Sequence, residues 1–154
     1  MRWVGLVGVL VAISVAKVAV NAGTGGSEGG SGKKHYSESA VLKEIEKGNY
    51  VPYLEMGAKA ANEKLPMTVD DETTLDSITA GPGLVMNYSY TKFKIAKEDV
   101  SATEMAAFRP KLIEMYKTEE SLKHFRDGNV EMRYHYHDKN HELIASVVIS
   151  PKDF

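Results

Sequence analysis

Apolar and polar residues alternate in several stretches of the chain, and a period of two is typical of strands with one buried face. The alternation is clearest in the last two stretches, which a turn at 138–141 separates. We expect their core-facing residues to be Val130, Met132, Tyr134 and Tyr136, followed by Leu143, Ala145, Val147 and Ile149. Leu84–Phe93 alternates in the same way and is predicted to bury Leu84, Met86, Tyr88 and Tyr90.

Four other segments are predicted to be helices, the first two from the spacing of their apolar residues and the last two from capping residues at their start. They span residues 38–47, 53–64, about 99–116 and about 118–126. The first ends at Gly48 and the second stops before Pro66, and Asp99 or Ser101 caps the third.

Short strands are expected near Met67–Asp70 and Thr73–Thr79, with a turn at Gly81-Pro82-Gly83 before the alternating stretch. The predicted order is therefore two helices, strands, a helical region and two strands. This order indicates an α+β domain, a small antiparallel sheet with helices on one face.

The N-terminal pattern differs, because Trp3–Ala22 is mostly apolar and Lys17 is its only charged residue. Its length of about 20 residues matches a transmembrane helix, and Arg2 on the short side predicts that the N-terminus stays inside. Gly23–Gly32 is rich in glycine and serine, a composition that is typical of a flexible linker. We therefore divide the chain into an anchor or signal peptide (1–22), a linker (23–36) and an exported domain (37–154).

Small residues recur every fourth position in the apolar segment, at Gly8, Ala12 and Ala16. Such a stripe allows two membrane helices to approach closely and indicates a homo-oligomer through this helix. Val20-Asn21-Ala22 also suits signal peptidase, so a cleaved signal peptide is the alternative. Both interpretations export the domain.

Composition narrows the function further. Hydrophobic residues make up 43% and charged residues 26% of the chain, as in a folded domain. The formal net charge is −2, and since residues 1–22 hold two basic residues and no acidic one, the remainder has a net charge of −4. Such a charge argues against nucleic-acid binding. The chain has no cysteine, which excludes disulfides and thiolate chemistry.

The stretches LPMTVDDETTLDSITAGPG and RYHYHDKNHELIASVVISPKDF resemble a family of small exported bacterial proteins of unknown function. Members pair an L-P-M-x-V-D-x-E-T-x-L-D run and a G-P-G turn with a tyrosine-rich strand and a C-terminal hairpin. The resemblance covers roughly Ala60 to Phe154. It implies export and the order of elements given above, and it implies no activity.

The chain departs from that family at two positions. The resemblance implies a cysteine in the middle helix and another at the C-terminus, plausibly disulfide-bonded. Here Phe154 ends the chain, and no cysteine lies near Met115 and Tyr116. We expect Phe154 to pack near Met115 or Tyr116, so that apolar burial replaces the cross-link.

Candidate chemistry is sparse. His135, His137 and His141 surround the last turn, and His-x-His on a strand is a spacing that zinc and copper sites use. Polar strand faces also carry such residues without any metal, so whether the three bind one stays open. The acidic run at Asp70, Asp71, Glu72 and Asp76 lacks the spacing of a calcium loop. We expect Asp70 and Asp76 to fix turns. The prediction is therefore no catalytic, cofactor-binding or metal site.

These observations favour a non-enzymatic domain tethered in the inner membrane by residues 3–22 and facing the periplasm. Its expected role is that of an accessory subunit that binds an envelope or membrane protein. The alternative is a soluble periplasmic or secreted protein, released by signal cleavage, that binds a small ligand or inhibits a partner.

Overall fold

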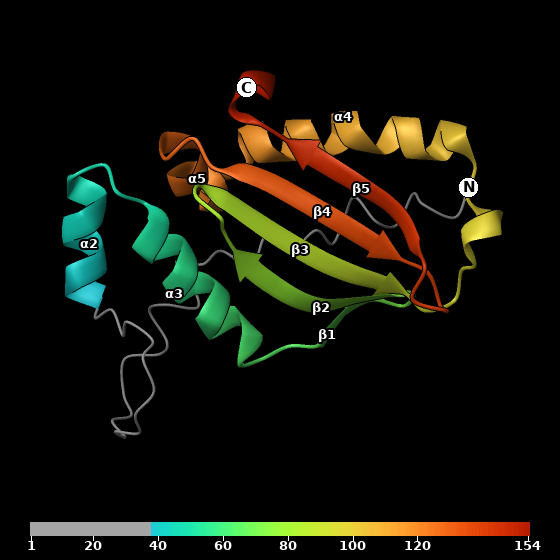
Figure 1. The fold of residues 1–154 in the computed structure, drawn as a ribbon. Coiled ribbons are helices and arrows are strands. Elements are labelled where there is room, and N and C mark those ends of the chain that lie inside the picture. Colours follow the sequence, from blue (N-terminus) through green and yellow to red (C-terminus); the bar gives the residue numbers. More distant parts are fainter. Residues whose placement is uncertain (1–37) are drawn as a thin grey trace.

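The computed structural model describes residues 38–154, which form a five-stranded sheet with helices packed against one of its faces (Figure 1). The elements follow the chain in this order, where η marks a short 3-10 helix: α2 (Glu38–Glu46), α3 (Val51–Asn62), β1 (Met67–Asp70), β2 (Thr73–Ala80), β3 (Val85–Lys92), η2 (Lys97–Asp99), α4 (Ala102–Thr118), η3 (Glu120–Leu122), α5 (Lys123–Asp127), β4 (Glu131–His137), β5 (Leu143–Ile149) and η4 (Pro151–Asp153). The predicted α+β class is confirmed.

The sheet is mixed, which corrects the expectation of an antiparallel one. Its strands lie in sequence order from β1 to β5. Three neighbouring pairs are antiparallel, whereas β3 and β4 are parallel, with Val85 opposite Glu131 and Thr91 opposite His137. The reason is the crossover between them, because α4 carries the chain back to the end of the sheet where β3 begins (Figure 1).

The core lies between the sheet and the helices. The sheet contributes Leu75, Ile78, Met86, Tyr88, Tyr90, Met132, Tyr134, Tyr136, Ala145, Val147 and Ile149, all of them buried. Leu54, Ala58, Phe108, Leu112, Tyr116 and Phe125 meet them from α3, α4 and α5. The tyrosines stack in register across β3 and β4, with ring centroids 5.4 Å apart for Tyr88 and Tyr134 and 5.2 Å apart for Tyr90 and Tyr136. The period of two therefore predicted most of the residues that the sheet contributes to the core.

Two residues expected in the core are exposed instead. Leu84 lies just before β3 and is 36% exposed. Leu143 is 46% exposed because the β4–β5 register shifts: Ala145 pairs with Tyr136, but Leu143 pairs with His137. The extra residue in β5 reverses the alternation at this point, so Leu143 lies on the open face.

The start of α4 follows the predicted cap at Ser101. The Glu104 N–H donates to Ser101 Oγ at 3.2 Å, and the Ser101 N–H donates to Glu104 Oε2 at 3.0 Å. These two bonds form a capping box, which satisfies donors that the first helical turn leaves free. Of the two predicted caps, the structure therefore confirms Ser101 and not Asp99.

Phe154 packs against the far end of α4, as expected from the sequence. Its ring centroid lies 4.7 Å from that of Tyr116, which is fully buried. The Tyr116 hydroxyl in turn donates to the Val130 carbonyl at 3.0 Å. The C-terminus is thereby attached to the helix layer without a covalent bond.

Between residues 38 and 154, the structure has no helix that is both long and apolar enough to cross a membrane. The predicted anchor at residues 3–22, its stripe of Gly8, Ala12 and Ala16, and the linker at 23–36 lie outside the described residues. The division into segments stays a prediction.

Candidate functional site

The outer edge of the sheet along β5 is the first candidate site. β5 is the last strand in the sheet and has β4 as its neighbour on one side. On the other side, Arg109 Nε of α4 donates to the Val148 carbonyl at 3.3 Å. Since backbone groups of successive strand residues point to opposite edges, Ser146 also presents its N–H and C=O on this outer side. Val148 is 40% exposed, so the edge is in part apolar.

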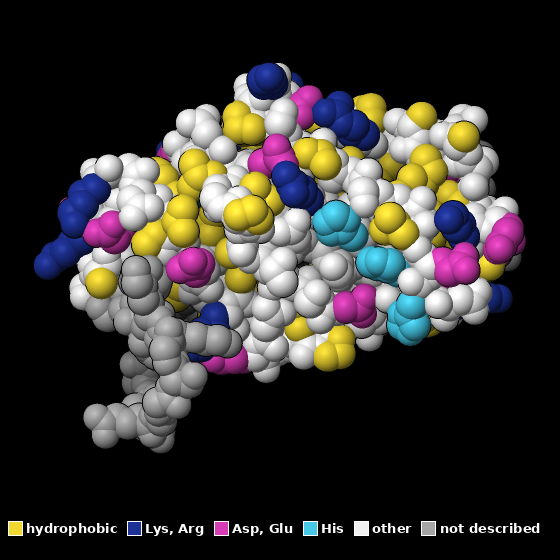
Figure 2. Space-filling view, viewed as in Figure 1, with side chains coloured by type: hydrophobic (Ala, Val, Ile, Leu, Met, Phe, Trp, Pro, Cys, Tyr) yellow, Lys and Arg dark blue, Asp and Glu magenta, His cyan; other side chains and the backbone are white. Residues whose placement is uncertain are grey.

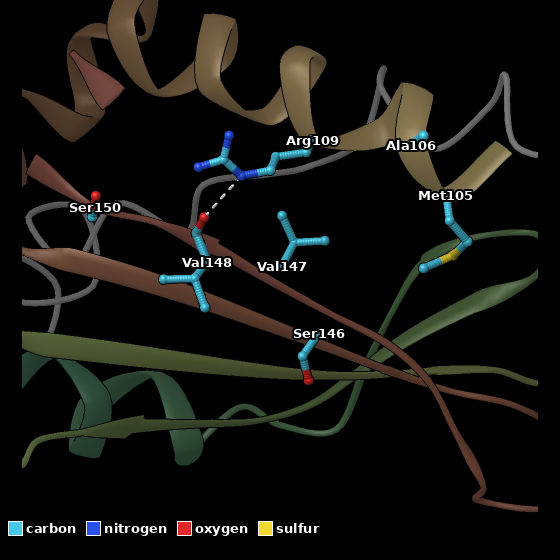
Figure 3. Close-up of a pocket in the computed structure, with 7 residues that line it drawn as sticks. All are labelled: Met105, Ala106, Arg109, Ser146, Val147, Val148 and Ser150. Atoms are coloured by element: carbon cyan, nitrogen blue, oxygen red, sulfur yellow. Dashed lines mark hydrogen bonds between the residues drawn. The ribbon is translucent and has the colours of Figure 1, made fainter. Parts of the chain in front are cut away.

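A groove of about 560 Å³ follows this edge between α4 and β5 (Figure 3). Its walls come from two elements: Met105, Ala106 and Arg109 of α4, and Ser146, Val147, Val148 and Ser150 of β5 and the residue after it. Met105 points from the helix toward the strand, and the Arg109 side chain crosses the gap to Val148 (Figure 3). Pro110 has no N–H, so the Ala106 carbonyl lacks its usual helical donor four residues on.

Arg109 is held in place by the C-terminal turn. Its Nη2 lies 2.8 Å from Asp153 Oδ1. Asp153 also accepts the Ser150 N–H at 2.8 Å, and this bond, followed by the Arg109 guanidinium, lowers the pKa of the Asp153 carboxyl. Both side chains are partly exposed, so the pair positions Arg109 more than it stabilises the fold.

The face of the sheet away from the helices is the second candidate site, and it is polar. In one cross-strand row, His135 of β4 lies between two small residues, Ser89 of β3 and Ser146 of β5. In the next row, Thr91 of β3 lies opposite His137 of β4. In Figure 2 histidine side chains gather on the surface where β4 and β5 run. His135 Nδ1 lies 2.8 Å from Ser146 Oγ, and His137 Nδ1 lies 3.3 Å from the Tyr90 carbonyl.

The third histidine of this region is placed differently. His141 lies in the β4–β5 turn with a φ of 64°, and its N–H donates to the Asp138 carbonyl at 3.0 Å. In the part of the chain that the structure describes, no group of three His, Cys, Asp or Glu residues is arranged to hold a metal ion. The structure thus does not bring His135, His137 and His141 into one three-ligand site.

Asp70 fixes a turn, as predicted, whereas Asp76 lies within β2 and bonds the neighbouring strand instead of a turn. Asp70 Oδ1 accepts the Glu72 N–H at 2.8 Å across the β1–β2 turn. Asp76 Oδ2 accepts the Thr91 hydroxyl at 2.7 Å, at the point where the register between β2 and β3 shifts. Gly81-Pro82-Gly83 forms the predicted hairpin turn, which the Gly81 N–H closes by donating to the Val85 carbonyl at 2.8 Å.

Two buried charged residues were missed by the sequence reasoning. Lys92 is 2% exposed, and its Nζ donates to the buried Thr73 hydroxyl at 2.8 Å. Burial lowers the pKa of Lys92, while Asp70 and Glu72 oppose that shift. Its position could have been found, because Lys92 continues the alternation of Met86, Tyr88 and Tyr90 on the core side.

Asp138 is fully buried in the turn after β4 and accepts three backbone N–H groups, from Lys97, Asn140 and Glu142, at 2.7–3.1 Å. Burial acts to raise its pKa, but these three bonds outweigh that effect and lower it. Asn140 belongs to the predicted turn at 138–141, and Glu142 follows directly after it. The third donor, Lys97, is 41 residues away from Asp138, and no pattern in the sequence connects the two. The role of Arg109 at the β5 edge lacks a signal for the same reason.

Comparison with solved structures shows which proteins share this fold. The Pseudomonas aeruginosa protein PA3611, provisionally described as secreted, has a TM-score of 0.58 at 14% identity, over 73% of this chain and 96% of PA3611. The type II secretion system pilotin AspS of Vibrio cholerae has a TM-score of 0.53 at 11% identity, over 72% and 99%. The pilotin EpsS of the Vibrio vulnificus type 2 secretion system has 0.54 at 9%, over 73% and 96%.

The sequence itself matches no curated protein. It does match a family, over residues 53–145, which run from the start of α3 into β5. This match confirms the resemblance to a family of unknown function that the sequence motifs indicated. The chain belongs to the family described as domain of unknown function DUF8479.

Proposed function

We propose that the protein is a non-enzymatic accessory subunit of a bacterial envelope complex, and that it binds its partner at the outer edge of β5. The fold supports this proposal, because two of the similar structures are pilotins of type II secretion systems and the likeness covers nearly all of each. The observation that carries the proposal is the groove between α4 and β5, beside a strand that has no strand neighbour on that side among residues 38–154.

A comparison with the other side of the sheet supports the choice of this edge. β1 has four residues and a register shift, and short, irregular edge strands resist pairing. Beyond β1, Asn62 of α3 occupies the outer side of β2: its side chain donates to the Ile78 carbonyl at 2.5 Å and accepts the Ile78 N–H at 3.0 Å. β5 has seven residues, and the Arg109 bond to Val148 is at its C-terminal end.

The occupant that fits this edge is an extended segment of a partner protein, added beside β5 as a further strand. Such a segment gains main-chain bonds from the edge and specificity from alternate side chains. Met105 and Val148 offer apolar contacts, and Arg109, whose side chain is 48% exposed, offers a positive charge. We therefore propose a segment with apolar residues at alternate positions and a carboxylate that meets Arg109.

The proposed location is the bacterial envelope, with residues 3–22 as a tether in the inner membrane and the domain in the periplasm. A released protein is the alternative, and the groove volume of about 560 Å³ falls in the range of small-molecule sites. Mass spectrometry of the intact protein from membranes separates the two. A chain that keeps residues 1–22 supports the tether, and one that starts near Gly23 supports the released form.

Site-specific photo-crosslinking tests the docking edge directly. A photoreactive phenylalanine analogue replaces Val148 in one variant and Leu42 in another, since Leu42 is 55% exposed on α2 and does not line the groove. We expect one discrete adduct from position 148 in intact cells and none from position 42. Adducts that are equal at both positions, or absent at position 148, contradict the proposal.

A charge reversal extends the test. Arg109→Glu removes the positive charge of the groove, and Lys111→Glu makes the same change at an exposed residue of α4 that does not line it. We expect Arg109→Glu to abolish the adduct at position 148 and Lys111→Glu to leave it unchanged. Far-UV circular dichroism of both variants checks that the fold persists.

A further inference from the structure

The open face of the sheet carries two histidines whose rings share one side of β4. His135 and His137 are two residues apart on a strand, so both side chains project to the same face. The pairing residues on either side of His135 are Ser89 and Ser146. These short side chains leave room above the sheet beside the two rings.

One nitrogen of each ring has a hydrogen-bond partner in the sheet. His137 Nδ1 faces the Tyr90 carbonyl at 3.3 Å, and because a carbonyl only accepts, Nδ1 must carry the hydrogen. In the neutral ring, Nε2 then has a free lone pair. His135 Nδ1 lies 2.8 Å from Ser146 Oγ, which can accept in the same way. Among the described residues, neither Nε2 atom has a hydrogen-bond partner.

This arrangement is the one that metal-binding histidines adopt, in which one nitrogen binds the ion and the other donates to a carbonyl or hydroxyl. We propose that His135 and His137 bind one divalent transition-metal ion through their Nε2 atoms, with Ser146 and the Tyr90 carbonyl orienting the rings. Imidazole nitrogens suit Cu²⁺ and Zn²⁺, and Cu²⁺ is expected to bind more tightly. Water completes the coordination, because the described residues supply no third ligand.

The charges around the pair favour a site of moderate affinity. Arg133 lies on the same face of β4 and repels a cation, but its Nε is 2.6 Å from Glu131 Oε1, which offsets that charge. On the other side of the pair, the Asp76 carboxylate provides a negative charge. It accepts the hydroxyl of Thr91, which is the cross-strand neighbour of His137.

The site is independent of the proposed docking function, although Ser146 connects the two. Ser146 lines the α4–β5 groove and also bonds His135. A bound ion would fix the His135 ring and with it the Ser146 hydroxyl. The metal site therefore lies one hydrogen bond away from the edge where a partner strand is proposed to bind.

Isothermal titration of the full chain tests the site, with untagged protein in mild detergent after chelator treatment and with CuSO₄ or ZnCl₂ as titrant. Asparagine is the informative substitution, because its amide can keep the Nδ1 hydrogen bond while Nε2 is lost. We expect one ion per chain, with affinity lowered more than about tenfold in His135→Asn and in His137→Asn. Ser146→Ala is expected to weaken binding less, by up to about tenfold, and Ser146→Thr to restore it.

His141→Asn and His35→Asn are the controls, and both should bind as the wild type does. Electron paramagnetic resonance of the Cu²⁺ complex should show two imidazole nitrogens. The proposal is wrong if no saturable binding occurs, or if His135→Asn and His137→Asn bind like the wild type. It is also wrong if His141→Asn or His35→Asn loses as much affinity as they do, since the ion would then sit elsewhere.

Discussion

The two faces of the β3–β4 pair come from the same strands and differ in nearly every property. On the covered face, Tyr88 stacks on Tyr134 and is 2% exposed. One residue further along each strand, Ser89 lies opposite His135 on the open face, and both of these side chains are only partly buried. The difference shows that alternation alone separates a face for stability from a face for binding, and each prediction below tests one aspect of that separation.

The largest effect is expected from truncating neighbours on opposite faces. Tyr134→Ala removes a buried ring and leaves a cavity, which should lower the free energy of unfolding by about 3–5 kcal/mol. His135→Ala, one residue away on the open face, should change it by about 0.5 kcal/mol or less. Urea unfolding followed by circular dichroism measures both. Comparable losses in the two variants would mean that the open face also carries stability.

How far the sequence predicts this separation depends on how local its causes are. Tyr88 and Tyr134 were assigned to the core from the alternation alone. Leu143 was misplaced because a one-residue register shift in β5 has no sequence signal. The shift puts Leu143 on the open face, while Ala145, Val147 and Ile149 beyond it stay on the covered face. The parallel pairing of β3 and β4 was missed for a similar reason, since alternation predicts strands without indicating their direction.

The candidate site was predicted only in part. His135 and His137 were recognised from their spacing, which is local. The contact of Arg109 with Val148, 39 residues away, arises from the packing of α4 against the edge of the sheet. No periodicity within either segment encodes that contact. The groove therefore became visible only in the structure.

A second prediction compares two hydroxyl groups on the covered side. The Tyr116 hydroxyl bonds the Val130 carbonyl, so Tyr116→Phe should cost about 1–3 kcal/mol by leaving that buried carbonyl without this donor. The Tyr88 hydroxyl is buried without a hydrogen-bond partner in the described part of the chain, so Tyr88→Phe should be neutral or stabilising. Thermal unfolding of the two variants distinguishes them. Destabilisation by Tyr88→Phe would indicate a partner that residues 38–154 do not supply.

A third prediction concerns the C-terminal extension of the covered side. Phe154→Ala removes the ring contact with Tyr116 and should lower stability by about 1 kcal/mol, or the Tm by about 3–6 °C. Phe93→Ala is the matched control, because Phe93 is 43% exposed and Phe154 is 37% exposed. Among the described residues, the one ring contact of Phe93 is with the Lys94 ammonium, which lies 5.9 Å from the ring centroid. Its Tm should change less. An unchanged Tm in Phe154→Ala would refute the idea that this contact stands in for a cross-link.

The smallest expected effect is a pH dependence that originates on the open face. Burial, His137 and Arg133 lower the pKa of His135 below its ordinary value of 6.5, so the folded state resists protonation there more than the unfolded chain does. This contribution to stability is fully present above pH 6.5 and is lost as the pH falls through the folded pKa. His135→Asn removes it, so the decrease in the urea midpoint between about pH 7.5 and about pH 5 should be smaller than in the wild type. Since the His135 side chain is only partly buried, the difference should be slight but of that sign. A larger decrease in His135→Asn would show that protonated His135 stabilises the fold instead.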